Sequence, residues 1–195
     1  GLGDTPMINV MMGECVGGSS VLTGAVCFRT PGAVLRTWST DLGLTELDEA
    51  AMEPFFDDVE RAVHVEEVPE TMRSRSTLAF ARGAERLGHP LRPLRRNTKG
   101  CRGCGRCNFG CPEGAKMSVD VTYLVRAIAA GARVDVDFHV EKLLTKGARA
   151  RGVTGRIRNG LNRAPKSRFT LHAKRVVLSA GAYCTPLLLE RAAIG

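Results

Sequence analysis

The feature that most constrains the fold lies near the end of the chain, where an apolar run leads into a small-residue turn. Residues 175–179 read Arg-Val-Val-Leu-Ser, a pattern typical of a strand buried on both faces. Ala180-Gly181-Ala182 follows, and then a predicted helix with Pro186 near its first turn. A doubly wound sheet holds a nucleotide at such a strand–turn–helix unit. We therefore predict an α/β fold here, with ordinary strand–helix packing as the alternative to a ligand site.

A second small-residue segment lies near the start and reads Gly13-Glu14-Cys15-Val16-Gly17-Gly18-Ser19-Ser20. Adjacent glycines let the backbone approach a ligand closely, and exposed N–H groups can hold phosphate or ring carbonyl oxygens. The two serines add hydroxyl donors. Taken alone, the segment is explained more simply as a tight turn between two elements.

Helices and short strands are predicted between these two segments. The predicted helices are Thr45–Val63, with Thr45 as its N-cap, Ser76–Leu87 and Val119–Ala130. The predicted strands are Met7–Met12, Val134–Phe138, Val140–Leu144, Gly152–Ile157 and Phe169–His172. The last four form a β-meander, and residues 91–112 are predicted to be irregular. No run of apolar residues is long enough to predict a membrane span.

The net charge of +8 is unevenly distributed. Residues 41–70 hold eleven acidic residues and one basic residue, whereas residues 141–175 hold eleven basic residues and one acidic residue. Residues 73–106 add ten Lys and Arg against a single Glu. A basic surface can attract nucleic acid, but only Phe80 interleaves with these arginines, so base stacking has little support. We predict no nucleic-acid partner and interpret the basic residues as a solvated face or as contacts to an acidic neighbour such as residues 41–70.

Four of the seven cysteines fall within eleven residues, at Cys101, Cys104, Cys107 and Cys111. Two residues separate the first and second cysteines and the second and third, three residues separate the last two, and Pro112 follows. This spacing matches that of bacterial ferredoxins and predicts iron–sulfur ligation. Zinc, and thiols or disulfides without metal, stay open as alternatives. Clustered cysteines in a chain of ordinary composition indicate reduced thiols, and therefore a cytoplasmic location.

Together, the two small-residue segments resemble the two signatures of the glucose–methanol–choline (GMC) family of FAD-dependent oxidoreductases. The first signature is similar to Gly13–Thr23, with its Gly-Gly-Ser-Ser core, and the second to Gly181–Gly195, with its Thr-Pro pair. The resemblance covers nearly the whole chain. The cysteine stretch, continuing to Gly114-Ala115-Lys116, resembles a subset of the family similar to long-chain alcohol and sterol oxidases.

The resemblance implies FAD as cofactor and an α/β, FAD/NAD(P)-binding (Rossmann-like) fold. That fold is expected to be incomplete and to carry a helical insertion and a β-meander. The implied segments are 1–40, an FAD-contacting part; 41–131, a helical and cysteine-rich insertion; and 132–195, the meander with the returning strand and helix. The implied cofactor-binding residues are Val16, Gly17, Gly18, Ser19, Ser20, Thr23, Val140, Gly181, Thr185 and Pro186.

No residue here matches the family's catalytic histidine, so no catalytic residue is predicted. The chain has no initiator Met and no signal peptide, and we expect it to be an internal part of a longer enzyme. The resemblance implies oxidation of a long-chain, sterol or sugar alcohol to a carbonyl, with an external electron acceptor. The alternatives are an iron–sulfur electron-transfer module without flavin and a zinc-bearing nucleic-acid binder.

Overall fold

The computed structural model describes residues 10 and 12–194, and the chain divides into two compact units. The first is Gly1–Ala132 and the second is Arg133–Gly195. Most of the predicted strand Met7–Met12 lies outside the described residues. No helix in the described part has the length and apolar composition needed to cross a membrane.

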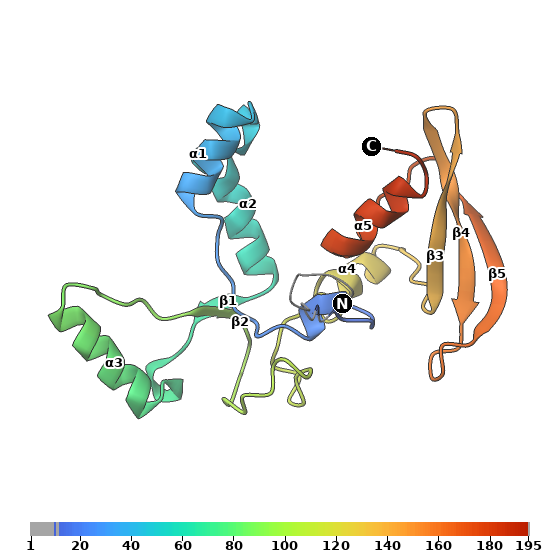
Figure 1. Ribbon diagram of the computed structural model, residues 1–195. Helices are drawn as coiled ribbons and strands as arrows, with labels where there is room; N and C mark the ends of the chain where they lie inside the picture. The colour runs from blue at the N-terminus through green and yellow to red at the C-terminus, as the bar shows by residue number, and fades with distance from the viewer. Residues whose placement is uncertain (1–9, 11, 195) are drawn as a thin grey trace, which may run out of the picture. The chain divides into compact units, whose positions relative to one another are not determined.

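The first unit is mainly helical (Figure 1). Its helices are α1 (Gly32–Asp41), α2 (Glu49–Ala62), α3 (Arg75–Arg86) and α4 (Tyr123–Ala129). Three 3-10 turns accompany them, at Gly18–Val21, Thr45–Leu47 and Glu70–Met72. The predicted helices over 45–63, 76–87 and 119–130 are thus present with different ends, and α1 is an additional helix.

Local hydrogen bonds explain where the helices begin. Asp48, not Thr45, is the N-cap of α2, since its carboxylate accepts from Ala51 N at 2.7 Å. Ser74 caps α3 in the same way and accepts from Thr77 N at 3.1 Å. The third helix starts later than predicted because Ser118–Val121 closes a turn first, with Val121 N donating to Ser118 O at 3.1 Å.

A two-stranded antiparallel ladder holds the first unit together in its middle. β1 (Val65–Glu67) pairs with β2 (Arg95–Asn97), and Val26 bridges to the other side of β2 at Arg96. The sequence analysis missed both strands. They are short and charged, and the ladder pairs residues far apart along the chain, so no local alternation marks them.

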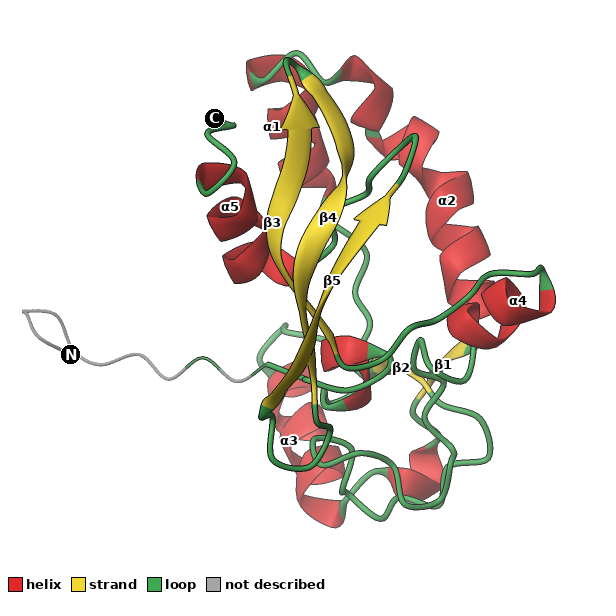
Figure 2. Ribbon diagram, turned by 90° about the vertical axis from the view of Figure 1, so that its right-hand side faces the viewer, coloured by secondary structure: helices red, strands yellow, loops and turns green. Residues whose placement is uncertain are grey.

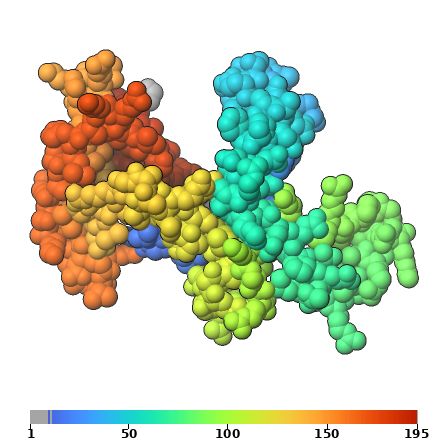
Figure 3. Space-filling view, turned by 180° about the vertical axis from the view of Figure 1, so that it is seen from behind, coloured from blue at the N-terminus to red at the C-terminus, as the bar shows by residue number. Residues whose placement is uncertain are grey.

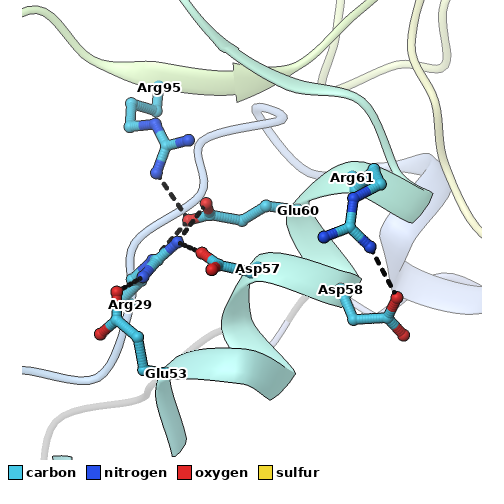
Figure 4. A network of polar contacts seen from close by, with 7 residues as sticks. All are labelled: Arg29, Glu53, Asp57, Asp58, Glu60, Arg61 and Arg95. Carbon is cyan, nitrogen blue, oxygen red and sulfur yellow. Dashed lines mark hydrogen bonds and ion pairs between the residues drawn. The ribbon is translucent and has the colours of Figure 1, made fainter. Parts of the chain in front are cut away.

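A partly buried cluster of charges, centred on Glu60, holds α2 beside this ladder (Figure 4). Arg29 reaches three acidic side chains of α2, with Nη1 2.8 Å from Glu53, Nη2 2.7 Å from Glu60, and a short contact to Asp57. Arg95 of β2 reaches the same Glu60 at 2.6 Å. Hydrogen bonds from Arg29 and Arg95 hold the pKa of Glu60 down at about 2, against the opposing effect of its burial. The Arg95–Glu60 pair joins the basic residues 73–106 to the acidic residues 41–70, which is one of the two interpretations of the charge pattern.

The second unit is a three-stranded antiparallel meander with one helix (Figure 2). Its elements are β3 (Phe138–Lys146), β4 (Arg149–Arg158), β5 (Pro165–His172) and α5 (Gly181–Glu190). The sheet order β3-β4-β5 confirms the predicted β-meander. The predicted strand Val134–Phe138 is wrong except at its last residue, because Asp137 takes a positive φ of 63° that ends the extended conformation.

The predicted buried strand over residues 175–179 is also wrong. This segment joins no ladder within residues 10 and 12–194, and Val177 is 86% exposed. A buried strand needs neighbours on both edges, and no described strand supplies one. Both sheets of the described part are antiparallel, so the doubly wound Rossmann-like sheet stays a prediction.

The described residues bury few apolar side chains. The buried hydrophobic residues are Ala25, Leu35, Ala115 and Leu188. Large apolar side chains are exposed instead, among them Phe55 on α2 and Phe80 on α3, two helices whose surfaces are coloured cyan and green in Figure 3. Packing within the described residues therefore contributes little to stability.

Candidate cofactor site

Residues 13–23 form a tightly folded turn in the first unit. Gly13 N donates to the Ser19 hydroxyl at 3.0 Å, and Gly18 N donates to Cys15 O at 2.8 Å. A Cβ on Gly13 would lie 2.6 Å from Gly18 O, so only glycine permits this closure. The turn therefore presents backbone and hydroxyl groups in a small volume.

Gly17 and Gly18 serve different purposes in this turn, although both have positive φ, of 91° and 57°. A Cβ on Gly17 would lie 2.8 Å from Val21 and 2.9 Å from Asp120, so Gly17 is required for internal packing. A Cβ on Gly18 would meet no heavy atom of the described residues within 4 Å. At Gly18, glycine is therefore favoured by the positive φ alone and not by packing against described residues.

The turn is anchored by the segment that follows the cysteines. Ser20 Oγ accepts from Val119 N at 3.1 Å and donates to Gly17 O at 2.6 Å. Lys116, only 3% exposed, donates to Val21 O at 2.5 Å and to Thr23 O at 2.7 Å. Two residues of the predicted site, Ser20 and Thr23, are thus bonded to a chain segment almost a hundred residues away.

Lys116 also binds the cysteine-rich loop, since its Nζ donates to Cys107 O at 3.0 Å. Burial lowers the pKa of Lys116, while the nearby Cys107, Cys111 and Asp120 act in the opposite sense. The sequence analysis noted Lys116 only as part of a family resemblance. The only sequence signal for Lys116 is its place after Gly114 and Ala115, shortly after the last of the clustered cysteines.

The structure does not gather the four clustered cysteines into a metal site. No group of three or more His, Cys, Asp or Glu side chains in the described ranges is placed to hold a metal ion. Cys107 Sγ instead accepts from Arg96 Nη2 at 2.6 Å, and Cys101 Sγ accepts from Gly103 N at 3.4 Å. The iron–sulfur and zinc predictions for Cys101, Cys104, Cys107 and Cys111 therefore gain no support.

Cys111 lies in a different environment from an ordinary exposed thiol. Burial alone would raise its pKa, but hydrogen bonds from the backbone N–H groups of Lys116, Glu113 and Ala115 together lower it. Three N–H groups directed at one sulfur favour the thiolate. The loop thus uses this thiol as an acceptor for its own backbone.

The other four predicted site residues lie in the second unit. Val140 lies in β3 opposite Gly155 of β4, beside a register shift between Val140 and Lys142. A Cβ on Gly155 would lie 3.0 Å from the Cα of Val140 and would clash with the carbonyl group of His139. Gly155 therefore allows the two strands to approach where Val140 bends away from regular pairing.

Gly181, Thr185 and Pro186 belong to α5. Gly181 has a φ of 84°. As at Gly18, a Cβ on this residue would meet no described heavy atom within 4 Å. Thr185 Oγ1 accepts from Ala180 N at 3.0 Å and thereby holds the turn before the helix. Pro186 lies inside α5 rather than near its first turn, because the helix already begins at Gly181.

A separate pocket of about 400 Å³ lies between α3 and residues 91–94. Its lining is mostly apolar and includes Met72, Leu78 and Leu94. Arg73 at this pocket donates to Val68 O at 3.0 and 2.9 Å. The pocket shares no lining residue with the two predicted cofactor turns.

Comparison with known proteins identifies the class of this mixed α/β chain. The model of the family described as GMC oxidoreductase matches residues 2–195. An uncharacterized GMC-type oxidoreductase of Mycobacterium tuberculosis is 37% identical over 190 residues, covering 97% of this chain and 29% of that protein. The long-chain-alcohol oxidase FAO3 of Arabidopsis thaliana is 28% identical over 186 residues, covering 92% of this chain and 25% of that protein. The uncharacterized GMC-type oxidoreductase y4nJ of Sinorhizobium fredii is 29% identical over 189 residues, covering 97% and 37%.

These matches place the chain among oxidoreductases. It belongs to the GMC oxidoreductase family, as the two glycine-rich signatures predicted. The chain spans between a quarter and two fifths of the length of these relatives.

Proposed function

We propose that this chain forms part of the FAD-binding domain of an enzyme that oxidises the CH–OH group of an alcohol to a carbonyl. The observation that carries the proposal is the family match over residues 2–195, which includes both glycine-rich turns. A ligand could approach the backbone at Gly18 and at Gly181, because no described heavy atom lies within 4 Å of the Cβ position of either glycine. A Rossmann-like parallel sheet completed by other parts of the enzyme belongs to the same proposal.

The residues proposed to hold FAD divide between two turns and one strand. In the first unit, the turn would present Val16, Gly17, Gly18, Ser19, Ser20 and Thr23. In the second unit, the backbone of Val140 would pair with adenine, while Gly181, Thr185 and Pro186 would line the nucleotide groove. Bound FAD would supply the acceptor for the hydride leaving the carbinol carbon. The chain's own residues bind and orient, and none of them is assigned as the base.

The substrate class we favour is a long-chain alcohol, with sterol and sugar alcohols as the other candidates. Three relatives in the same range of identity as FAO3 also carry the name long-chain-alcohol oxidase, which supports this choice. An external electron acceptor would reoxidise the flavin. We also propose a cytoplasmic location, on the clustered cysteines alone.

The test uses the full-length enzyme that contains this chain. Purified protein should show flavin absorbance and should release FAD, identified by chromatography against a standard, when it is denatured. Dodecanol, cholesterol and sorbitol should then be compared as donors, once with oxygen and once with an artificial dye as acceptor. We expect the highest kcat/KM with dodecanol. Purified, well-folded enzyme that neither contains FAD nor takes it up would refute the proposal.

A further inference from the structure

Lys116 is a buried cation that the proposed function leaves unexplained. Its side chain is 3% exposed, and its ammonium donates to the carbonyl oxygens of Val21, Thr23 and Cys107 at 2.5, 2.7 and 3.0 Å. An ammonium group has three protons to donate, so these three acceptors use all of them. Every acceptor is a backbone carbonyl, so the contact depends on the path of the chain rather than on other side chains.

Burying a charge is unfavourable unless its hydrogen bonds are fully made. An apolar side chain at this position would avoid the cost of burying a charge, but the carbonyl groups of Val21, Thr23 and Cys107 would lose their hydrogen-bond donor. The charged group is therefore suited to orienting backbone, because hydrogen bonds to a charged donor are stronger than neutral ones.

The two carbonyls in the turn determine which way its peptide groups face. In a trans peptide the C=O and the following N–H point in opposite directions. Holding Thr23 O on Lys116 therefore directs the N–H of Gly24 away from the lysine. The same segment fixes Ser20, whose hydroxyl accepts from Val119 N at 3.1 Å. Hydrogen bonds from Lys116 and Val119 therefore fix the backbone orientation of the turn.

The third carbonyl connects this anchor to the cysteine-rich loop. Cys107 contributes its carbonyl to Lys116, and its sulfur accepts from Arg96 Nη2 at 2.6 Å. Arg96 belongs to β2, so the loop is held by the central ladder of the first unit. The loop therefore forms a support behind the turn, which is a role for the cysteine motif that needs no metal.

We propose that Lys116 is a positioning residue for FAD, which fastens the Gly17–Thr23 turn to the cysteine-rich loop and so orients the backbone that contacts the cofactor. The proposal rests on the proposed function, since it takes this turn to be a cofactor contact. It assigns no chemical step to Lys116, which touches neither substrate nor reacting atoms.

The test compares three variants of the full-length enzyme. Lys116→Met removes the ammonium and keeps most of the side-chain volume. Lys116→Arg keeps a positive charge, but its planar fork does not converge on three carbonyls. Lys99→Met is the matched control, because it makes the same change at an exposed lysine of the same unit. The dissociation constant for FAD, the visible spectrum of the bound flavin and the melting temperature of the apoprotein are measured for each.

We expect Lys116→Met to bind FAD at least about tenfold more weakly and to shift the flavin absorbance bands, since it loses three bonds to a charged donor. Lys116→Arg should show a smaller loss, and Lys99→Met should match the wild type. An unchanged FAD affinity and spectrum in Lys116→Met, with only a lower apoprotein melting temperature, would overturn the inference. If Lys116→Met does not fold, Lys116→Arg decides: wild-type affinity and spectrum overturn the inference, and weaker binding supports it. A wild-type enzyme that holds no FAD would instead refute the proposed function.

Discussion

Arg29 and Glu60 form a two-pronged ion pair, with Nε 2.9 Å from Oε1 and Nη2 2.7 Å from Oε2. This geometry aligns the planar guanidinium with the carboxylate, the arrangement in which such pairs are strongest. The Glu60 side chain is only 16% exposed. The pair therefore joins α2 to the segment before α1 at a partly buried position.

Replacing Glu60 with Gln should destabilise the enzyme by about 2 kcal/mol, because two arginines lose their shared carboxylate. Asp58→Asn is the control, since the Asp58–Arg61 pair of Figure 4 is exposed, with side chains 77% and 73% accessible. Chemical denaturation of the full-length proteins measures both. Equal, small effects from the two variants would show that the buried pair contributes no more than the exposed one.

The same carboxylate makes stability depend on pH. The pKa of Glu60 is lowered from 4.5 to about 2, so its contribution is present above pH 4.5 and is lost as the pH falls toward 2. Wild type and Glu60→Gln should therefore differ in unfolding free energy at neutral pH and converge in this acid range. A difference that stays constant across the range would contradict the assignment.

The two adjacent glycines of the first turn should respond differently to alanine. Gly17→Ala should cost about 3 kcal/mol of stability, from its positive φ and from overlap with Val21 and Asp120. Gly18→Ala should cost only about 1 kcal/mol in the apoprotein, because its Cβ points into open space. If FAD lies against Gly18, the second variant should also lose at least about tenfold in FAD affinity. An FAD affinity that is unchanged in Gly18→Ala would show that the cofactor does not contact Gly18.

The thiols should react as free groups. Cys111 has a lowered pKa, so its alkylation by iodoacetamide should reach half of its maximal rate at a lower pH than that of an ordinary thiol. Mass spectrometry of peptides from the full-length enzyme measures the extent of alkylation of each cysteine separately. Joint protection of Cys101, Cys104, Cys107 and Cys111, released by a chelator, would instead reveal a metal and revive the ferredoxin interpretation.

The isolated 195 residues should not unfold cooperatively. Among residues 10 and 12–194, the buried hydrophobic residues are Ala25, Leu35, Ala115 and Leu188, which form a small core for so many residues. Thermal unfolding followed by circular dichroism should give a broad transition, with strong binding of a hydrophobic dye beforehand. A sharp transition that coincides by two probes would contradict this expectation.

Local signals allowed much of the fold to be predicted from the sequence. Three of the four predicted meander strands are present with different ends, because their alternation extends over several residues. The helices α2 and α3 were identified from an apolar repeat and from the stop signal at Gly88 and Pro90, with errors only at their ends. The ladder of β1 and β2 was missed because Val65 and Asn97 pair across 32 positions without a local pattern. The strand at 175–179 failed because an apolar run indicates burial but not whether neighbouring strands exist.

In the candidate site, too, local features could be predicted from the sequence and long-range contacts could not. Gly17, Gly18, Ser19 and Ser20 were recognisable because small residues in a row are visible locally. The role of Lys116 was not, because its acceptors Val21 and Thr23 lie more than 90 positions away. The cysteine spacing suggested a metal, but spacing does not reveal that Cys107 is bonded to Arg96 or that Cys111 accepts from its own loop.

We propose that this chain helps the enzyme that contains it to oxidise alcohols with FAD. The most direct measurement mixes the full-length, FAD-loaded enzyme with dodecanol in the absence of oxygen and follows the flavin absorbance. We expect the absorbance to bleach as the flavin is reduced, with an equivalent amount of the aldehyde formed. A flavin that stays oxidised with dodecanol, cholesterol and sorbitol alike would contradict it.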